Sequence, residues 1–331
     1  MKKLHFWLGI LISLIALSWA LKGIRWNDFS SALQTINYGW FIPVLCLMLI
    51  SIWCRAIRWK LFFVSTHNLS TLRFFNITNI GYLVNNLFPF RVGELVRIYL
   101  IGELENISKA HVFTTVLIER TMDTLMILLF LALSIPYVPI VPEIIRQSSV
   151  IIGILVSCLM VLLILLAHHK NKTMLKLRRL CSFVRYLNHE KFYQKIESLL
   201  DGLDVLSSLK LGLQTIILSL FIWLLYAFLT YLMFLAFNLE LTFVAAIFIV
   251  SVSSLGVALP SSPGYIGVYH SLIIFSLSLF SVEKSVALSY ALIFHGWQYI
   301  FLTLLGGVGL WKEGISYAHF NEVEKQAESK S

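Results

Sequence analysis

The feature that most constrains this chain is the length of its apolar runs. The segments 4–21, 147–167 and 211–237 carry no Asp, Glu, Lys or Arg. Apolar runs of roughly 18 or more residues are long enough to cross a bilayer as helices. In lipid only helices and closed barrels satisfy every backbone hydrogen bond, and these runs are continuous rather than alternating. The sequence therefore predicts an all-α polytopic membrane protein with about six to eight transmembrane helices.

Charge and composition agree with a membrane protein and argue against other classes. Only 13% of the residues are charged, whereas a soluble domain carries about 25%. The net charge of +9 comes mostly from loops, where the retention of positive loops in the cytoplasm explains it. The aromatic residues lie in lipid-length runs rather than on a basic stacking face, so we expect no nucleic-acid partner. The cysteines form no C-x-x-C pair, and we expect neither a metal nor a cofactor.

The apolar runs place the spans along the chain. We predict spans at about 4–21, 39–58, 112–135, 147–167, 211–237 and 286–311. We interpret the first as a retained anchor rather than a signal peptide, because its run is long and lacks a clean small-x-small site. The second span ends in basic residues with tryptophans at belt positions, which is typical of a cytoplasmic interface. These residues are Arg55, Arg58 and Lys60, with Trp53 and Trp59.

Basic residues in the loops predict an orientation. The longest polar region, 168–210, carries nine Lys or Arg residues, whereas the 136–142 loop carries none. We therefore expect 168–210 in the cytoplasm, partly helical and on the membrane surface, and the 136–142 loop outside. The N-terminus and the charged tail 312–331 fall on the cytoplasmic side as well. The expected location is the cell (inner or cytoplasmic) membrane.

One apolar segment in the first part of the chain is interrupted. Its arms cover about 72–88 and 92–101, and Pro89 lies at the break. Each arm is too short to cross about 30 Å comfortably at 1.5 Å per residue. A re-entrant hairpin is therefore predicted.

A second interrupted segment, 241–280, breaks at 259–264. Its arms are each long enough to cross, so a re-entrant hairpin and two full spans both remain open. Span, broken segment, span thus occurs at 39–135 and again at 211–311, in opposite orientation. This pattern predicts an inverted repeat within a single transmembrane domain, 1–311, with a transport site where the repeats meet.

The first break carries charge. Arg91, Glu94 and Arg97 are spaced i, i+3, i+6, so they share a broad helix face on which Glu94 can pair with either arginine. Two arginines against one carboxylate leave positive charge, and arginine suits bidentate recognition of phosphate or carboxylate. The pattern predicts a site for an anionic headgroup, beside the alternative that these charges only pair structurally at the interface.

The third span adds Glu119, Arg120 and Asp123, about two turns into the membrane. Arg120 reaches Asp123 at i+3, and pairing of the carboxylates with Arg91 or Arg97 would neutralise both groups. A structural clamp and a functional role both fit this set. Since ionisable groups at membrane depth are costly, we expect them around one polar cavity.

The second break predicts a helix start inside the membrane. Ser262 suits the N-cap and Pro263 the first helical position, so free N–H groups and a positive dipole end would face the cavity and attract an anion. The alternative is an ordinary tight turn. If the breaks form one site, Arg91 or Arg97 approaches Ser262 or Gly264. His270 lies two turns further on and is expected to be a packed, hydrogen-bonded residue.

Three motifs in order carry a family resemblance. The chain has Pro89-x-Arg91-x-Gly93-Glu94-x-x-Arg97, then Glu119-Arg120-x-x-Asp123, then Pro260-x-x-Pro263-Gly264-x-x-Gly267. Together they resemble the lysylphosphatidylglycerol synthase transmembrane (flippase-like) family, from about residue 10 to 312. The resemblance implies the membrane part only, because a chain ending at Ser331 leaves no room for the soluble synthase domain of some members. The family often has a Glu shortly after the last Gly, whereas this chain has Tyr269-His270.

The resemblance implies movement of lipids or lipid-linked headgroups between leaflets. The expected substrate is a membrane phospholipid or a polyprenyl-linked lipid, bound in an anion-binding central cavity. One alternative is an accessory subunit of a separate glycosyl- or aminoacyl-lipid transferase. Another is a headgroup-modifying enzyme, but no nucleophile-plus-base constellation is recognised, so no catalytic residue is expected. The candidate substrate-binding residues are Arg91, Glu94, Arg97, Glu119, Arg120, Asp123, Ser262, Gly264 and His270, and the structural break positions are Pro89, Gly93, Pro260, Pro263 and Gly267.

Overall fold

The computed structural model describes residues 31, 33–63, 69–181, 190–258 and 262–315. All regular secondary structure in these residues is helical, in twelve α-helices labelled α3 to α14 and three short 3₁₀ turns. The all-α prediction is confirmed for this part of the chain. The predicted first span 4–21, the break position Pro260 and most of the tail 312–331 lie outside the described residues.

Within the described residues, four helices are long and apolar enough to cross a membrane. They are α3 (Phe41–Leu61, preceded by the turn η1, Tyr38–Trp40), α7 (Glu143–His168), α11 (Leu209–Ala236) and α14 (Lys284–Lys312). A fifth helix, α6 (Lys109–Ser134), has 26 residues but carries three charged residues in its middle. A short turn, η2 (Ile135–Tyr137), follows it. The chain is therefore a multi-pass membrane protein, and the helices agree with the predicted spans within a few residues.

The first interrupted segment has the predicted arms. They are α4 (Thr71–Leu87) and α5 (Val92–Leu104), and Pro89 lies between them. Phe90 and Arg91 have left-handed backbone angles, with φ of 63° and 56°, which a continuing helix excludes. The arms pack so closely that a Cβ on Gly93 would lie 1.9 Å from the carbonyl oxygen of Gly81, so only glycine fits there.

The second interrupted segment consists of α12 (Phe243–Val257), the turn η3 (Pro263–Tyr265) and α13 (Val268–Ser278). The two helices have 15 and 11 residues, fewer than the roughly 20 that a crossing requires.

The predicted half-helix starting at Ser262 is wrong. Pro263 does open η3, but this is a single turn, and the hydroxyl of Ser262 donates to the carbonyl oxygen of Ile266 (2.8 Å) instead of capping a helix. The reason is that Gly264 and Tyr265 have φ of 58°, which interrupts the helix. The next helix, α13, begins only after Gly267.

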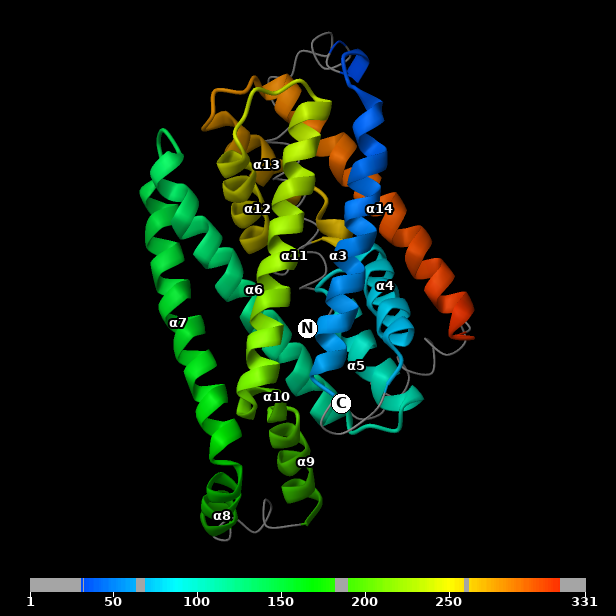
Figure 1. The fold of residues 1–331 in the computed structure, drawn as a ribbon, viewed down its shortest axis with the longest axis vertical. Coiled ribbons are helices and arrows are strands. Elements are labelled where there is room, and N and C mark those ends of the chain that lie inside the picture. The colour runs from blue at the N-terminus through cyan, green and yellow to red at the C-terminus, as the bar shows by residue number, and fades with distance from the viewer. Residues whose placement is uncertain (1–30, 32, 64–68, 182–189, 259–261, 316–331) are drawn as a thin grey trace.

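The two broken segments lie toward opposite ends of the molecule. In Figure 1, α4 and α5 lie in the half that bears α8 to α10, whereas α12 and α13 lie toward the other end. The packing between them is reciprocal, because α4 packs against α14 and α12 packs against α6, while α3 packs against α11. Each first arm thus contacts the last long helix of the other half of the chain.

The polar region 168–210 is partly helical, as predicted. It forms α8 (Lys170–Cys181), α9 (Glu190–Asp201) and the short α10 (Asp204–Ser207). The ammonium of Lys170 contacts the carboxylate of Asp201, which ties α8 to α9. Helix α9 packs against α6, and its Tyr193 and Leu200 are buried. This region is therefore attached to the helical bundle as well as lying at its end (Figure 1).

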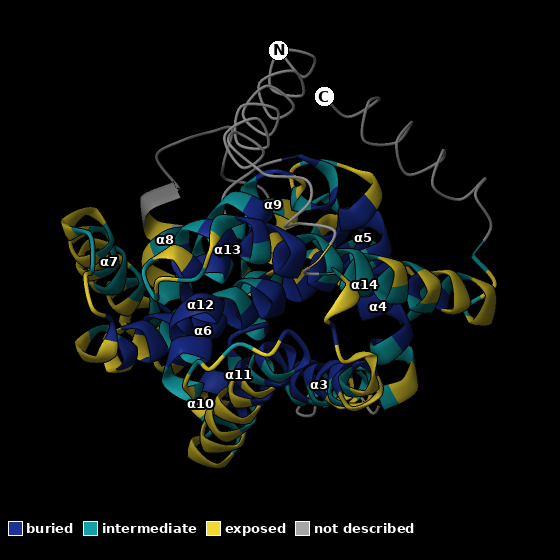
Figure 2. Ribbon diagram, turned by 90° about the horizontal axis from the view of Figure 1, so that it is seen from above, coloured by how far each residue is buried: buried dark blue, intermediate teal, exposed yellow. Residues whose placement is uncertain are grey.

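Burial separates an interior from an apolar outer surface. Figure 2 shows buried residues concentrated between α4, α6 and α12 and exposed ones on α7 and α14. Only 11% of the most apolar stretch of α7 is buried, and its exposed residues include Ile151, Leu155 and Leu162. A helix that is apolar and exposed in this way is expected to face lipid. The interior holds two large apolar clusters, one formed mainly by α11 to α14 and one formed mainly by α4 to α6.

Candidate functional site

A cluster of charged side chains from α3, α5 and α6 is buried in the interior. One centre of it is Asp123 on α6. Arg55 Nη1 donates to Asp123 Oδ2 at 3.0 Å, and Arg58 Nη1 donates to Asp123 Oδ1 at 2.7 Å. The indole N–H of Trp223 on α11 also donates to Oδ1, at 3.0 Å. Asp123 is therefore neutralised and fully hydrogen-bonded by groups from α3 and α11, as a buried carboxylate requires.

The second centre is Glu119, one turn earlier on α6. Arg97 Nη2 of α5 donates to Glu119 Oε2 at 2.8 Å, and Arg120 contacts Glu119 Oε1. Arg58 Nη2 lies 3.7 Å from the same carboxylate. The guanidinium of Arg97 also lies over the ring of Trp59, 4.0 Å from its centroid. Arg97 thus combines an ion pair with a cation–π contact and is held rigidly.

A third, more accessible group consists of Arg91, Glu94 and Arg120. Glu94 Oε1 lies 3.4 Å from Arg91 Nε and 3.7 Å from Arg120 Nη1. The side chains of these three residues are 22–28% exposed, whereas those of Arg97 and Glu119 are 5% and 2% exposed. Glu94 therefore pairs with Arg91 and Arg120, not with Arg97, and this group is the part of the cluster that a ligand can reach.

The cluster as a whole is positive. We use the term charge cluster for Arg55, Arg58, Arg91, Arg97 and Arg120 with Glu94, Glu119 and Asp123. Five arginines share three carboxylates, so each arginine has a carboxylate partner but the cluster carries a net charge of +2. A charged residue at membrane depth costs about 2.5 kcal/mol or more, so uncompensated net charge is unfavourable there. A bound anion would offset this cost.

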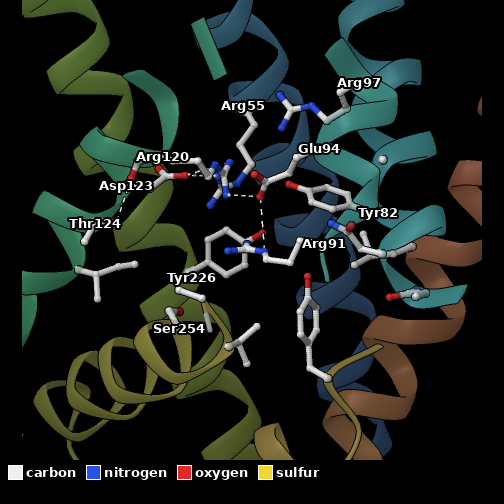
Figure 3. Close-up of a pocket in the computed structure, with 18 of the residues that line it drawn as sticks. Arg55, Tyr82, Arg91, Glu94, Arg97, Arg120, Asp123, Thr124, Tyr226 and Ser254 are labelled. Atoms are coloured by element: carbon white, nitrogen blue, oxygen red, sulfur yellow. Dashed lines mark hydrogen bonds and ion pairs between the residues drawn. The ribbon is translucent and has the colours of Figure 1, made fainter. Parts of the chain in front are cut away.

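The charge cluster opens on a cavity of about 220 Å³, the charged cavity (Figure 3). Arg55, Arg91, Glu94, Arg97, Arg120 and Asp123 line it from the first half of the chain. Trp223, Tyr226, Ser254 and Tyr265 line it from the second half. Figure 3 shows Arg91, Glu94, Tyr82 and Tyr226 converging on this space. The cavity is therefore built jointly by segments far apart in the sequence.

A second cavity of about 150 Å³ adjoins the first, and we call it the neutral cavity. Its polar lining consists of Asn86, Ser253, Ser254, Tyr265, Tyr269, His295, Gln298 and Tyr299. Asn86, Ser254 and Tyr265 also line the charged cavity, together with Val257 and Leu302. The two cavities therefore share a wall.

The two breaks meet at this shared wall. Asn86, near the end of α4, donates to Tyr299 O at 3.2 Å and to Thr303 Oγ1 at 2.9 Å, and the Tyr299 hydroxyl donates to Asn86 O at 3.1 Å. Gly264 is packed beside the ring of Tyr299. The hypothesis that the breaks approach each other holds, but Tyr265, rather than Ser262 or Gly264, shares the charged cavity with Arg91 and Arg97.

His270 lies behind the neutral cavity. Its Nδ1 accepts from the N–H of Gly267 (3.2 Å), and its Nε2 lies 3.2 Å from Nδ1 of His295. Both histidines are buried. His270 is thus a packed, hydrogen-bonded residue that holds the start of α13, and it lines neither cavity. Within the described residues, no group of three or more His, Cys, Asp or Glu side chains could hold a metal ion.

The interpretation of the end of α3 as an interfacial belt is wrong for three residues. Arg55, Arg58 and Trp59 are buried at 6%, 0% and 0% exposure, because α4, α6 and α11 pack against α3. The spacing of polar and apolar residues along α3 could have predicted this burial. Met48, Ser51, Arg55 and Arg58 recur at i, i+3, i+7 and i+10, which is one helix face, and all four are buried.

Comparison with known proteins covers nearly the whole chain. Residues 6–306 match the family described as the lysylphosphatidylglycerol synthase TM region. A UPF0104 membrane protein of Methanocaldococcus jannaschii is 25% identical over 319 residues, which are 91% of this chain and 93% of the relative. A UPF0104 membrane protein of Pyrococcus horikoshii is 26% identical over 321 residues, 91% of this chain and 94% of the relative. No solved structure matches the chain. The chain therefore belongs to the lysylphosphatidylglycerol synthase transmembrane region family.

Proposed function

We propose that this protein is a flippase-like carrier that moves an anionic lipid, or a lipid-linked headgroup, between the leaflets of the cell membrane. One observation carries the proposal. The charge cluster has two positive charges in excess and opens, through Arg91 and Arg120, on a cavity shared by both halves of the chain. A phosphate in this cavity would supply the missing negative charge.

The arginines divide into two roles in this proposal. Arg91 and Arg120 bind the phosphate, because their side chains line the charged cavity and are 25% and 28% exposed. A guanidinium binds a phosphate through two parallel N–H groups, which fixes orientation as well as charge. Arg55, Arg58 and Arg97 position the carboxylates instead, since they are buried against Asp123 and Glu119.

The arrangement of the helices supports a carrier. The broken segments lie toward opposite ends of the long axis, the helical arms have 11 to 17 residues and are short for a crossing, and each first arm packs on the last long helix of the other half. These features favour two re-entrant hairpins in an inverted repeat. In such repeats access alternates when one half rocks against the other around a fixed site. We propose that the end bearing the basic helix α8 faces the cytoplasm.

Reconstitution of the purified full chain tests the proposal. Vesicles carrying a headgroup-labelled phosphatidylglycerol are treated with a membrane-impermeant quencher, and label that moves between leaflets changes its accessibility over time. We expect faster exchange than in protein-free vesicles and slower exchange for Arg91→Lys and Arg120→Lys. Arg146→Lys is a matched control, because Arg146 is exposed at the start of α7.

The same assay separates the alternatives. Exchange no faster than in empty vesicles, or normal exchange by both cavity variants, would overturn the carrier. Lipid extraction after the assay shows whether the headgroup has been chemically changed, which would indicate an enzyme. Movement that appears only when a separate transferase is added would indicate an accessory subunit.

A further inference from the structure

The neutral cavity differs in chemistry from the charged cavity beside it. None of its lining residues is Asp, Glu, Lys or Arg. Its titratable side chains are His295 and three tyrosines, and Nδ1 of His295 is already engaged by His270. A ligand group in this cavity therefore meets hydrogen-bonding and aromatic surfaces and no carboxylate, ammonium or guanidinium group.

Four polar groups around the neutral cavity have unused hydrogen-bonding capacity. The hydroxyls of Ser254, Tyr265 and Tyr269 and the carboxamide of Gln298 make no side-chain hydrogen bond within the part of the chain that the structure describes. Other polar groups here are satisfied, since Ser253 donates to Ile249 O at 2.7 Å. These four residues are only partly buried, so their polar groups are accessible from the cavity and can bond to whatever occupies it. Four unused groups around one space indicate that a hydroxylic ligand, or water in its place, occupies it.

The aromatic rings of the neutral cavity place a second requirement on its ligand. The rings of Tyr269 and His295 lie 4.6 Å apart, and the ring of Tyr299 meets His295 edge-on at 6.4 Å. Tyrosines of this kind offer an apolar face and a polar edge at once. A ligand with C–H groups as well as hydroxyls matches both surfaces.

The position of the neutral cavity connects it to the phosphate site. Asn86, Ser254 and Tyr265 line both cavities, together with Val257 and Leu302, so a group attached to a phosphate between Arg91 and Arg120 lies directly beside the neutral cavity. Its volume of about 150 Å³ far exceeds the roughly 10–15 Å³ that one water needs. It therefore has room for a small headgroup.

We propose that the neutral cavity is a subsite for an uncharged, hydroxyl-bearing headgroup, and that the protein selects a lipid phosphate ending in a polyol over one ending in an amine. This inference rests on the proposed phosphate site. An amine in this cavity would be a desolvated cation without a carboxylate to pair with. An acyl chain would leave the four polar groups unsatisfied.

Binding of three short-chain lipids to the purified full chain tests the subsite. The probes are a dialkyl phosphate, a phosphatidylglycerol with a diol headgroup and a phosphatidylethanolamine with an amine headgroup, titrated by calorimetry. We expect the phosphatidylglycerol to bind about tenfold more tightly than either of the others, since a site built for hydroxyls rejects analogues that lack them. In Gln298→Leu and Tyr269→Phe proteins this preference should fall to about twofold or less, and retained binding of the dialkyl phosphate reports that each variant is folded.

The outcomes distinguish the subsite from the phosphate site. Equal affinity for the three probes, or preference for the amine, would overturn the subsite and leave the phosphate site standing. Binding of none of the probes, or binding that Arg91→Lys and Arg120→Lys leave unchanged, would overturn the phosphate site itself. An unaltered preference in both Gln298→Leu and Tyr269→Phe proteins would show that selection arises elsewhere and would also overturn the subsite.

Discussion

The two breaks of this protein have the same backbone design and opposite chemistry. In each, two adjacent residues with left-handed φ angles separate a longer first helix from a shorter second one: Phe90 and Arg91 in the first break, Gly264 and Tyr265 in the second. The first break adjoins a cluster of eight charged residues, whereas the second adjoins histidines and tyrosines. The left-handed backbone conformation that interrupts the helix is therefore found beside charged and uncharged side chains alike.

The two breaks also differ in what holds them. The region around the first is fixed by ion pairs whose members were desolvated on folding, so removing one partner leaves a buried charge. The second is fixed by hydrogen bonds without ion pairs, such as that from the N–H of Gly267 to His270. Loss of such a bond leaves a polar group without a partner, which costs less free energy than an unpaired buried charge. The difference predicts unequal sensitivity of the two halves to mutation.

The largest effect is expected at Asp123. Asp123→Asn removes the charge that compensates Arg55 and Arg58, and a broken buried ion pair costs about 3–5 kcal/mol. We expect loss of folded protein, measured by yield and monodispersity on size exclusion and by thermal unfolding in detergent. Glu143→Gln is the control, because Glu143 is an exposed carboxylate at the start of α7. Equal yields of the two proteins would show that the charge cluster is not what holds the first half together.

Glycine substitutions compare the backbones of the two breaks directly. Gly93→Ala forces a methyl group against the backbone of Gly81. In Gly264→Ala the methyl group contacts the side chain of Tyr299, and the alanine must adopt a left-handed backbone conformation. We expect about 3 kcal/mol or more for Gly93→Ala and about 1–2 kcal/mol for Gly264→Ala. Thermal unfolding measures both. Gly153→Ala in α7 has open space and should be neutral or slightly stabilising; a reversed order of the first two would refute the proposed difference.

Arg97→Lys tests function more than stability. The ammonium keeps the charge but loses the bidentate contact with Glu119 and most of the stacking on Trp59. We expect lipid exchange in reconstituted vesicles to fall about tenfold, equivalent to about 1.4 kcal/mol, at normal expression. Arg146→Lys provides the reference rate. Full activity of Arg97→Lys would remove this residue from the site.

A smaller effect is expected at His270. His270→Leu removes the acceptor for the N–H of Gly267 and leaves Nδ1 of His295 without its partner, at a cost of about 1–2 kcal/mol. The melting temperature reports the loss, and faster amide exchange at the start of α13 locates it. A destabilisation as large as that of Asp123→Asn would contradict the distinction between a charged and a neutral break.

The last test concerns the orientation of the two broken segments in the membrane, and it involves no change in stability or activity. Ser108 precedes α6 at the end that bears α8 to α10, and Glu240 precedes α12 at the opposite end. In a chain whose native cysteines are replaced, we expect Glu240→Cys to react with an impermeant maleimide in intact cells and Ser108→Cys only after permeabilisation. Labelling of both from the same side would rule out hairpins that enter from opposite faces.

The sequence by itself determined the class of structure and the position of the breaks. Lipid leaves a long apolar run little choice except a helix, so the spans were predictable from hydropathy alone. Pro89 follows the end of α4 and the Pro263-Gly264 pair lies between α12 and α13, so the breaks lie where proline and glycine disfavour a continuous helix. The motif residues Arg91, Glu94, Arg97, Arg120 and Asp123 were likewise identified in advance, because charge within an apolar segment is conspicuous.

Only the tertiary structure decided which charges pair and what faces the cavities. Arg58 and Asp123 lie 65 residues apart, and a basic residue near the end of a span has the same local sequence whether it meets lipid headgroups or a buried carboxylate. Covering by α6 and α11 makes the difference, because it removes the water that would otherwise solvate Arg55 and Arg58. The neutral cavity also depends on contacts between Asn86 and Tyr299, 213 residues apart, which local sequence does not encode.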